Sequence, residues 1–321
     1  MRTMFKVVGS TALILAIGSV LMAQWPAFKT PGVPRTANGQ VDMNAPTPRT
    51  ADGKPDFTGL WQNGRGGGGA GAGGGRGGAG GAGRGGAGGP AAGGPPAGGT
   101  AATAAPPAGG PPPAGPPAGG PPAASFGNAG QGFPDRTLPY QPWAKALMEK
   151  RKADNSKDNP DAHCLPMGFM QFHTHPEPRK IVQTPTFMAI IYEANSGLRQ
   201  IFMDGRSLPP KDAEPWWYGY SVGKWEGDTL VVETSGFLDG IWLDVQGSPL
   251  TEQGKVTERF RRPNFGTLEI DITVDDPKAY TKPWTVRVSQ RLMPDNELIE
   301  FICEDRDATH YVGAATTPEA K

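Results

Sequence analysis

Apolar and polar residues alternate with a period of two through the second half of the chain, from about residue 180 to residue 305. Successive side chains of a strand point to opposite faces of a sheet. The alternation therefore predicts strands with one buried and one solvated face, as in antiparallel sheets. In the stretch 267–274, Leu268, Ile270, Ile272 and Val274 face one way, and Thr267, Glu269, Asp271 and Thr273 face the other. Similar runs occur at 255–262, 284–292 and 297–304.

The clearest element is a hairpin across residues 218–234. Its second strand, Thr229–Thr234, is rich in β-branched residues, which suit a pleated sheet. Gly227 lies in the interruption before it and can take the positive φ that a tight hairpin turn requires. A nearly continuous apolar run at 186–193 predicts a strand that is covered on both faces. Further strands are predicted at 198–203 and 241–245.

Eight or nine such strands predict a mainly all-β domain over residues 179–312, built as an antiparallel meander. It would form either a closed barrel of the lipocalin type or a strongly bent sheet. Closure removes both sheet edges, and a barrel of about eight strands can hold one small ligand. The alternation points Glu258 and Gln290 inward. Either the interior holds a polar cavity, or these two residues lie at its rim.

One short helix is predicted N-terminal to the sheet, at Pro142–Ala153. The segment contains strong helix formers and begins with proline, which is tolerated in the first turn. Trp143, Leu147 and Met148 would form an apolar stripe that packs against the sheet. The helix belongs to an otherwise irregular segment, 125–178.

Two histidines at the end of that segment are weak candidates for a metal site. His173 and His175 would share one face of an extended segment, and imidazole with the Glu177 carboxylate suits zinc or a similar transition metal. A catalytic zinc site needs three protein ligands, and His163 or His310 are alternatives for the third. The other reading is two surface histidines in a proline-bounded loop, with no cofactor.

The first 23 residues resemble a secretory signal peptide in their pattern. Arg2 and Lys6 precede the uncharged, mostly apolar stretch Val7–Ala23, and cleavage is expected after Ala23. The prediction is a periplasmic or secreted protein without a membrane span after cleavage. An uncleaved membrane anchor is the alternative, although the run is short for a span.

Low-complexity sequence separates the N-terminus from the sheet. Residues 24–63 read as an extended linker in which Phe57–Trp61 could dock as a short strand, and residues 64–124 are almost wholly Gly, Ala and Pro. Such a composition cannot bury enough apolar surface to fold, so this tract is predicted to be disordered, as is the tail 313–321. The chain has a formal net charge of zero, and the tract has only three arginines, which argues against a nucleic-acid partner.

Cys164 and Cys303 are the two cysteines of the chain. In an oxidising compartment an isolated pair usually forms a disulfide, which would tie the segment after the helix to the last strand. Two free buried thiols are the alternative.

Several motifs resemble a family of uncharacterised exported bacterial proteins. They are CLPMG (164–168), RQIFMDGR (199–206), SVGKWEGDTLVVET (221–234), ERFRR (258–262) and PWTV (283–286). The resemblance covers about half of the chain and implies export, but it brings no assigned reaction. Relatives often have Pro-Arg after the first motif where this chain has Phe169 and Met170, so a role for that arginine does not transfer.

The leading functional hypothesis is a non-enzymatic domain that binds a small apolar or amphipathic ligand. Aromatic side chains with a few polar groups line such pockets, and the candidates are Arg206, Trp216, Trp217, Trp225 and Glu258. The alternatives are a metal-assisted hydrolase or isomerase that uses His173 and His175, and an envelope interaction module on a flexible spacer. No nucleophile motif or nucleotide-binding motif supports another enzyme class, and no catalytic residue is predicted.

Overall fold

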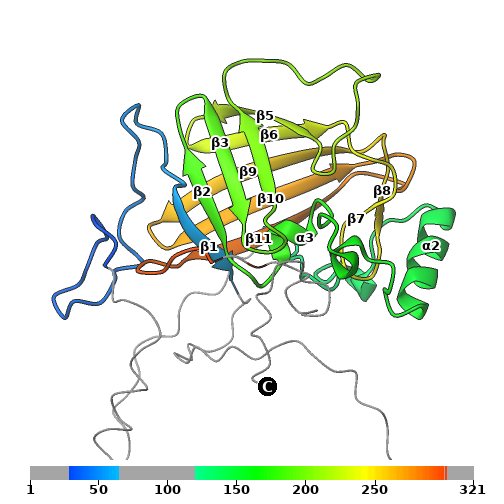
Figure 1. The fold of residues 1–321 in the computed structure, drawn as a ribbon, viewed down its shortest axis with the longest axis horizontal. Coiled ribbons are helices and arrows are strands. Elements are labelled where there is room, and N and C mark those ends of the chain that lie inside the picture. Colours follow the sequence, from blue (N-terminus) through cyan, green and yellow to red (C-terminus); the bar gives the residue numbers. More distant parts are fainter. Residues whose placement is uncertain (1–28, 65–119, 300, 302–321) are drawn as a thin grey trace, which may run out of the picture. The chain divides into compact units, whose positions relative to one another are not determined.

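A closed nine-strand barrel is the centre of the computed structural model, which describes residues 29–64, 120–299 and 301 (Figure 1). Around the barrel the strand order is β1-β11-β10-β9-β6-β5-β4-β3-β2, and β2 pairs with β1 again. The all-β barrel predicted from the alternation is confirmed. Its strands are β1 (Gly59–Asn63), β2 (Arg179–Gln183), β3 (Phe187–Tyr192), β4 (Leu198–Phe202), β5 (Tyr220–Glu226), β6 (Thr229–Ser235), β9 (Lys255–Asn264), β10 (Thr267–Asp275) and β11 (Trp284–Leu292).

The barrel is mixed and not a pure antiparallel meander. β4 and β5 run parallel, with Ile201 opposite Ser221, while the other neighbours in the barrel are antiparallel. The proline-containing stretch 203–219 carries the chain back so that β5 starts beside the end of β4. Period-two alternation is the same in both directions, so the sequence could not reveal this reversal.

The N-terminal strand β1 closes the barrel between β2 and β11. Phe57 and Trp61 are fully buried beside and within it, so the stretch predicted to dock is part of the barrel wall. The described residues on either side of the Gly/Ala/Pro-rich tract both hydrogen-bond to β11. Gly64 N donates to Ser289 O (2.8 Å), and Arg287 N donates to Pro122 O (2.8 Å), both on β11. Residues 65–119 lie outside the described part of the chain.

The 218–234 hairpin forms as predicted, with Gly227 at φ 61° between β5 and β6. The prediction that the 186–193 strand is covered on both faces is wrong within the described residues. On β3, Met188 and Ile190 are buried in the lumen, whereas Phe187 and Ala189 are only partly buried on the outer face. Of the predicted strand 297–304, residues 297–299 are irregular, so the prediction is wrong there; Phe301 makes a bridge with Ala194, and residues 300 and 302–304 are not described.

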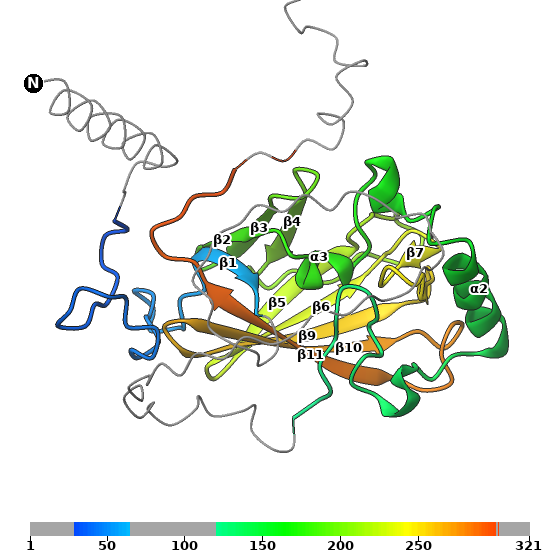
Figure 2. The same cartoon turned by 90° about the horizontal axis from the view of Figure 1, so that it is seen from below.

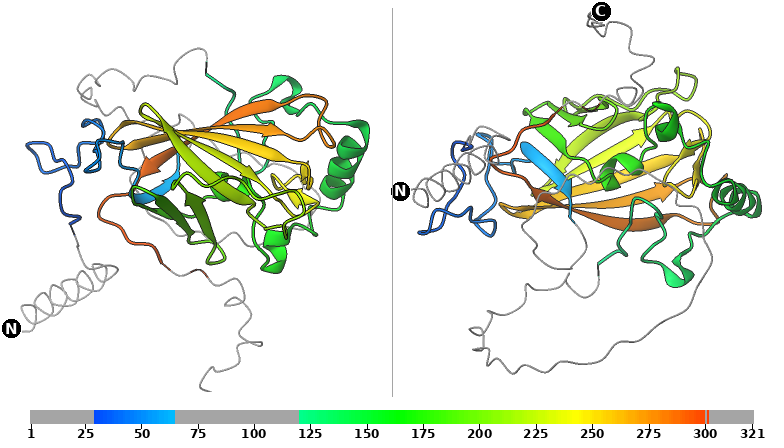
Figure 3. Two further views of the ribbon diagram at one scale, coloured as in Figure 1. Left: turned by 90° about the horizontal axis from the view of Figure 1, so that it is seen from above. Right: turned by 60° about the horizontal axis from the view of Figure 1, so that its bottom comes forward.

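The helices lie at the barrel's periphery and mouth. α2 (Pro142–Ala153) has the predicted bounds and packs beside a small ribbon of β7 (Ile241–Trp242) and β8 (Pro249–Leu250), as Figures 1 and 2 show. α3 (Gln171–Thr174) lies against the barrel strands, as Figure 2 and the right-hand view of Figure 3 show. Two short 3-10 turns, η1 (Pro134–Arg136) and η2 (Pro160–His163), complete the described elements. No described helix has the length and apolar character needed to cross a membrane.

Several predictions fall on residues outside the described ones. They are the signal peptide 1–23, most of the tract 64–124, His310 and the tail 313–321. Cys303 is also among them, so its disulfide with Cys164 stays a prediction. Two contacts near the cysteines are compatible with this disulfide. Phe301, two residues before Cys303, pairs with Ala194. Asn195, next to Ala194, donates to Oδ1 of Asp161 (2.8 Å), and Asp161 is three residues before Cys164.

Candidate functional site

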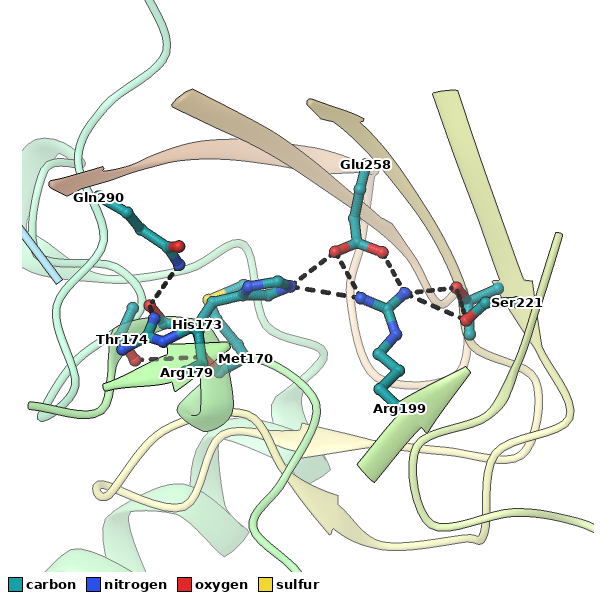
Figure 4. Close-up of polar contacts among 9 residues, drawn as sticks. Met170, His173, Thr174, Arg179, Arg199, Ser221, Glu258 and Gln290 are labelled. Carbon is teal, nitrogen blue, oxygen red and sulfur yellow. Dashed lines mark hydrogen bonds and ion pairs between the residues drawn. The ribbon is translucent and has the colours of Figure 1, made fainter. Parts of the chain in front are cut away.

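Three charged or titratable side chains meet inside the barrel: Glu258 from β9, Arg199 from β4 and His173 from α3 (Figure 4). Glu258 has no exposed surface, and the other two are 1 % exposed. The β alternation explains their direction, because Glu258 shares the inward face of β9 with Val256 and Phe260. A buried charge is costly unless it is paired, so the geometry of this cluster decides whether it is stable.

The charges in this cluster are matched. Arg199 Nη1 donates to Glu258 Oε1 at 2.9 Å, and Nη2 donates to Oε2, so the pair is bidentate. Nη2 also lies 3.1 Å from the hydroxyl oxygens of Ser221 and Thr234, on β5 and β6. The His173 ring approaches from the other side, with Nε2 2.6 Å from Glu258 Oε1. The pair thus spans the lumen from β4 to β9 and holds α3 as well.

The protonation states follow from these contacts. Burial alone would raise the pKa of Glu258, but Arg199 and the hydrogen bond from His173 outweigh it and hold that pKa at about 2. Burial lowers the pKa of His173, although Glu258 opposes this. His173 is therefore neutral, and Nε2 must carry the proton because the ionised carboxylate can only accept. Nδ1 is left as a buried lone pair without a hydrogen-bond partner.

A second arginine fixes the backbone of α3. Arg179 of β2 donates to the carbonyl oxygens of His173 (2.6 Å), His175 (2.8 Å) and Glu177 (2.9 Å). Gln290 of β11 donates to His173 O as well, at 3.3 Å. The last carbonyls of a helix have no partner within the helix, and here the barrel wall supplies donors for them. Burial lowers the pKa of Arg179 to about 10, which still leaves it protonated at neutral pH.

The lumen around this cluster is filled with side chains. Phe169 and Phe172 pack over the Arg199 guanidinium at 4.8 and 5.4 Å. The fully buried rings of Trp61, Phe57 and Phe260 occupy other parts of the interior. An imidazole oriented by a carboxylate can serve as a general base. In this barrel it is sealed from solvent, so the arrangement supports a structural role that fixes α3 in the barrel mouth.

The five residues predicted to bind a ligand lie in separate environments. Arg206 and Trp216 are both exposed and meet on the outside through Tyr220: Arg206 donates to its hydroxyl oxygen (3.0 Å), and the Trp216 ring lies 5.2 Å away. Trp217 is half-buried nearby in sequence. Trp225 stacks on Phe57, with ring centroids 5.5 Å apart. Glu258 is sealed in the lumen with Arg199.

The residues predicted to bind a metal do not converge on one point. The His173–Thr174 backbone is helical and not extended, so a spacing of two turns the imidazoles apart. His173 faces Glu258, whereas His175 Nδ1 lies 2.5 Å from Glu177 and its Nε2 lies 3.8 Å from Asp161. The two carboxylates therefore flank opposite nitrogens of one ring. His163 is exposed and donates to Lys157 O. Within the described ranges, no group of three His, Cys, Asp or Glu side chains could hold a metal ion.

A pocket of about 400 Å³ lies outside the barrel, where α2 meets the β7–β8 ribbon. Trp143 and Leu147 form one wall, and they are one helical turn apart on α2. The buried side of α2 carries Ala144 and Met148, so the predicted stripe is correct for Met148 and wrong for Trp143, which is 43 % exposed, and for Leu147, which lines the pocket. Asp239, Gly240, Pro249, Thr251 and Lys278 complete the lining.

Two contacts connect the lumen cluster to this pocket. Gly168, at the entry to α3, approaches Trp242 of β7 so closely that an added Cβ would lie 1.4 Å from its carbonyl oxygen. On the other side of Trp242, the Arg151 guanidinium of α2 lies 4.4 Å from the indole ring and donates to Gly247 O (2.9 Å). The position of α3 therefore constrains the ribbon and the helix that form the pocket.

No protein-family model, curated protein or solved structure matches this chain. The lumen cluster and the external pocket are therefore the two features of the molecule that bear on its function.

Proposed function

We propose that this protein is an exported, non-enzymatic binding protein whose small amphipathic ligand binds in the pocket between α2 and the β7–β8 ribbon. The observation that carries the proposal is the pocket itself. Its volume of about 400 Å³ falls within the range of small-molecule sites, and it combines an apolar wall with few polar groups. The filled lumen supports the same location, because a ligand there would have to displace buried aromatic rings.

Trp143 is the residue best placed to contact such a ligand. Its indole Nε1 donates to Lys278 O at 2.7 Å, which fixes the ring at the pocket, yet nearly half of the side chain remains exposed. A rigid, half-exposed tryptophan gives a large apolar contact area at a low cost in conformational entropy. The expected contribution of this ring to binding is about 2 kcal/mol or more, as for aromatic residues at the centre of other binding sites.

Isothermal titration with octyl-chain amphipaths below their micelle concentration tests the proposal. The wild-type protein should bind at least one of them with one-to-one stoichiometry. Trp143→Ala should weaken binding by about thirtyfold, which corresponds to about 2 kcal/mol. The matched control is Trp216→Ala, because Trp216 is similarly exposed, at 38 % against 43 %, but lies outside the pocket. Absence of binding by the wild type, or equal binding by the two variants, contradicts the proposal.

A further inference from the structure

The polar rim of the pocket indicates which ligand it prefers. Two carboxylates, Asp239 and Glu252, share one lysine there, Lys278. Lys278 Nζ is engaged by Glu252, at 2.9 and 3.1 Å from its two oxygens. Asp239 lies 4.0 Å from the same ammonium group and keeps 64 % of its side chain exposed. Of the two carboxylates, Asp239 lines the pocket, and its charge is compensated less than that of Glu252.

Other charges near the pocket do not change this balance. Arg151 stacks on Trp242, and its charge faces Asp244 and Asp158. Asp276 is buried and accepts hydrogen bonds from Thr251 and from the backbone that follows it. Lys145 and Glu149 pair with one another on the exposed face of α2. The rim therefore carries two negative charges against one positive charge.

The surroundings of Asp239 agree with this count. Partial burial raises the pKa of Asp239, and the neighbouring Glu252 raises it further. Asp239 and Glu252 repel each other, and a second cation beside Asp239, in addition to Lys278, would relieve that repulsion further. Trp143 lines the same pocket with 43 % of its surface exposed, and the face of an indole attracts organic cations.

We infer that the ligand is a cationic amphipath: an organic ammonium group faces Asp239 and the Trp143 ring, and its apolar body lies against Leu147 and Pro249. This inference rests on the proposed function, since it concerns the same pocket. It adds charge selectivity, because a neutral or anionic amphipath of the same chain length would gain neither contact.

Three ligands with one octyl chain test the inference: octyltrimethylammonium, octyl glucoside and octyl sulfate. The cation should bind about tenfold more tightly than the glucoside, as expected for one cation–π contact and one half-exposed ion pair, and the sulfate most weakly. In Asp239→Asn, which keeps the contact with Trp143, the preference for the cation over the glucoside should fall to about threefold, because only the ion pair is lost. Asp228→Asn is the control, because Asp228 is also 64 % exposed but pairs with Arg49 away from the pocket.

The outcomes separate the inference from the proposed function. Equal binding of cation and glucoside, or tighter binding of the sulfate, overturns the inference and leaves the binding pocket in place. A tenfold cation preference that is unchanged in Asp239→Asn also overturns it. If none of the three ligands binds, the proposed function itself fails.

Discussion

Glu258 is the residue on which the interior of the barrel depends. Its carboxylate compensates the charge of Arg199 and accepts a hydrogen bond from His173, so a single side chain joins β9, β4 and α3. The alternation of β9 was enough to predict that Glu258 points inward. Its partners could not be predicted, because Arg199 and His173 are far from it in the sequence and nothing local specifies long-range contacts.

Removing the charge of Glu258 should be strongly destabilising. Glu258→Gln preserves the shape but leaves the buried Arg199 without a counter-charge, which typically costs about 3–5 kcal/mol. The same substitution at Glu226 should cost less than about 1 kcal/mol, because its pair with Arg259 is nearly half exposed. Urea unfolding measures both. If Glu258→Gln unfolds at the same urea concentration as Glu226→Gln, the lumen cluster is not the stabilising element described above.

Stability should fall with acidity in two stages. The pKa values of His173 and Glu258 are both lowered in the folded protein, so each contributes stability above its unfolded pKa and loses it as the pH falls. Loss from His173 begins near its ordinary pKa of 6.5. Loss from Glu258 begins near 4.5 and continues to about 2. For Glu258 the total is on the order of 3 kcal/mol.

His173→Gln isolates the first stage. The wild type must be compared with this variant because His175 contributes to stability with the opposite sign. Burial would lower the pKa of His175, but Asp161 and Glu177 outweigh burial and raise it. Urea unfolding of both proteins between about pH 7 and pH 5 should show a steeper loss for the wild type than for His173→Gln. Parallel slopes would mean that His173 is not held neutral by its surroundings.

Most helices and strands could be predicted from the period of the hydrophobic pattern and from the residues that favour turns. The hairpin at Gly227, strands β3, β4, β9, β10 and β11, and α2 all lie close to where the pattern places them. Strand β2 and helix α3 were missed, because both are short and prolines at 166, 176, 178 and 185 flank them, which suggests a loop. Arg179 is the example: it is a charged residue in β2 that is 1 % exposed, and its role depends on the carbonyls of α3.

The direction of the α2 stripe was missed for a similar reason. Trp143 and Leu147 are the largest apolar residues near the start of the helix, so the pattern assigns them to the core. The structure buries the small Ala144 beside the ribbon and leaves the tryptophan at the pocket. An apolar residue that a helix leaves exposed was the available signal for the site, but only the packing of α2 against β8 shows which residue it is.

Residues 65–119 should be removable without loss of the fold. The residues that flank this segment, Gly64 and Pro122, are hydrogen-bonded to Ser289 and Arg287 of β11, so a short Gly-Ser linker can connect the two flanks. The composition of this tract predicts a flexible chain, and shortening such a chain by several-fold should stabilise the protein by about 1–2 kcal/mol. A deletion extended to 64–124 also removes the pairing of Gly64, Pro122 and Ala124 with β11, and it should be less stable than the shorter deletion. Thermal unfolding of the two variants decides; equal stability would show that these edge contacts contribute nothing.

At the scale of the whole molecule, the chain builds a barrel with a filled interior and places its open pocket beside it. The strands of the barrel were predictable, since alternation and turns act through local sequence, whereas its closure depends on the long-range pairing of β1 with β2 and β11. The sequence could not show whether the lumen is empty, because that depends on how α3 and the rings of Phe57, Trp61 and Phe172 pack together. The connection from Arg199 through α3 and Trp242 to α2 makes the barrel a rigid support for the pocket.

Photo-crosslinking tests the location of the ligand most directly. An octyl amphipath that binds the full chain, carrying a diazirine on its alkyl chain, is irradiated in the complex, and the adducts are mapped by peptide mass spectrometry. The account predicts adducts on the α2 peptide that contains Trp143 and Leu147 and on the ribbon at Pro249. Adducts on lumen residues such as Phe172 or Phe260, with α2 unlabelled, would contradict it.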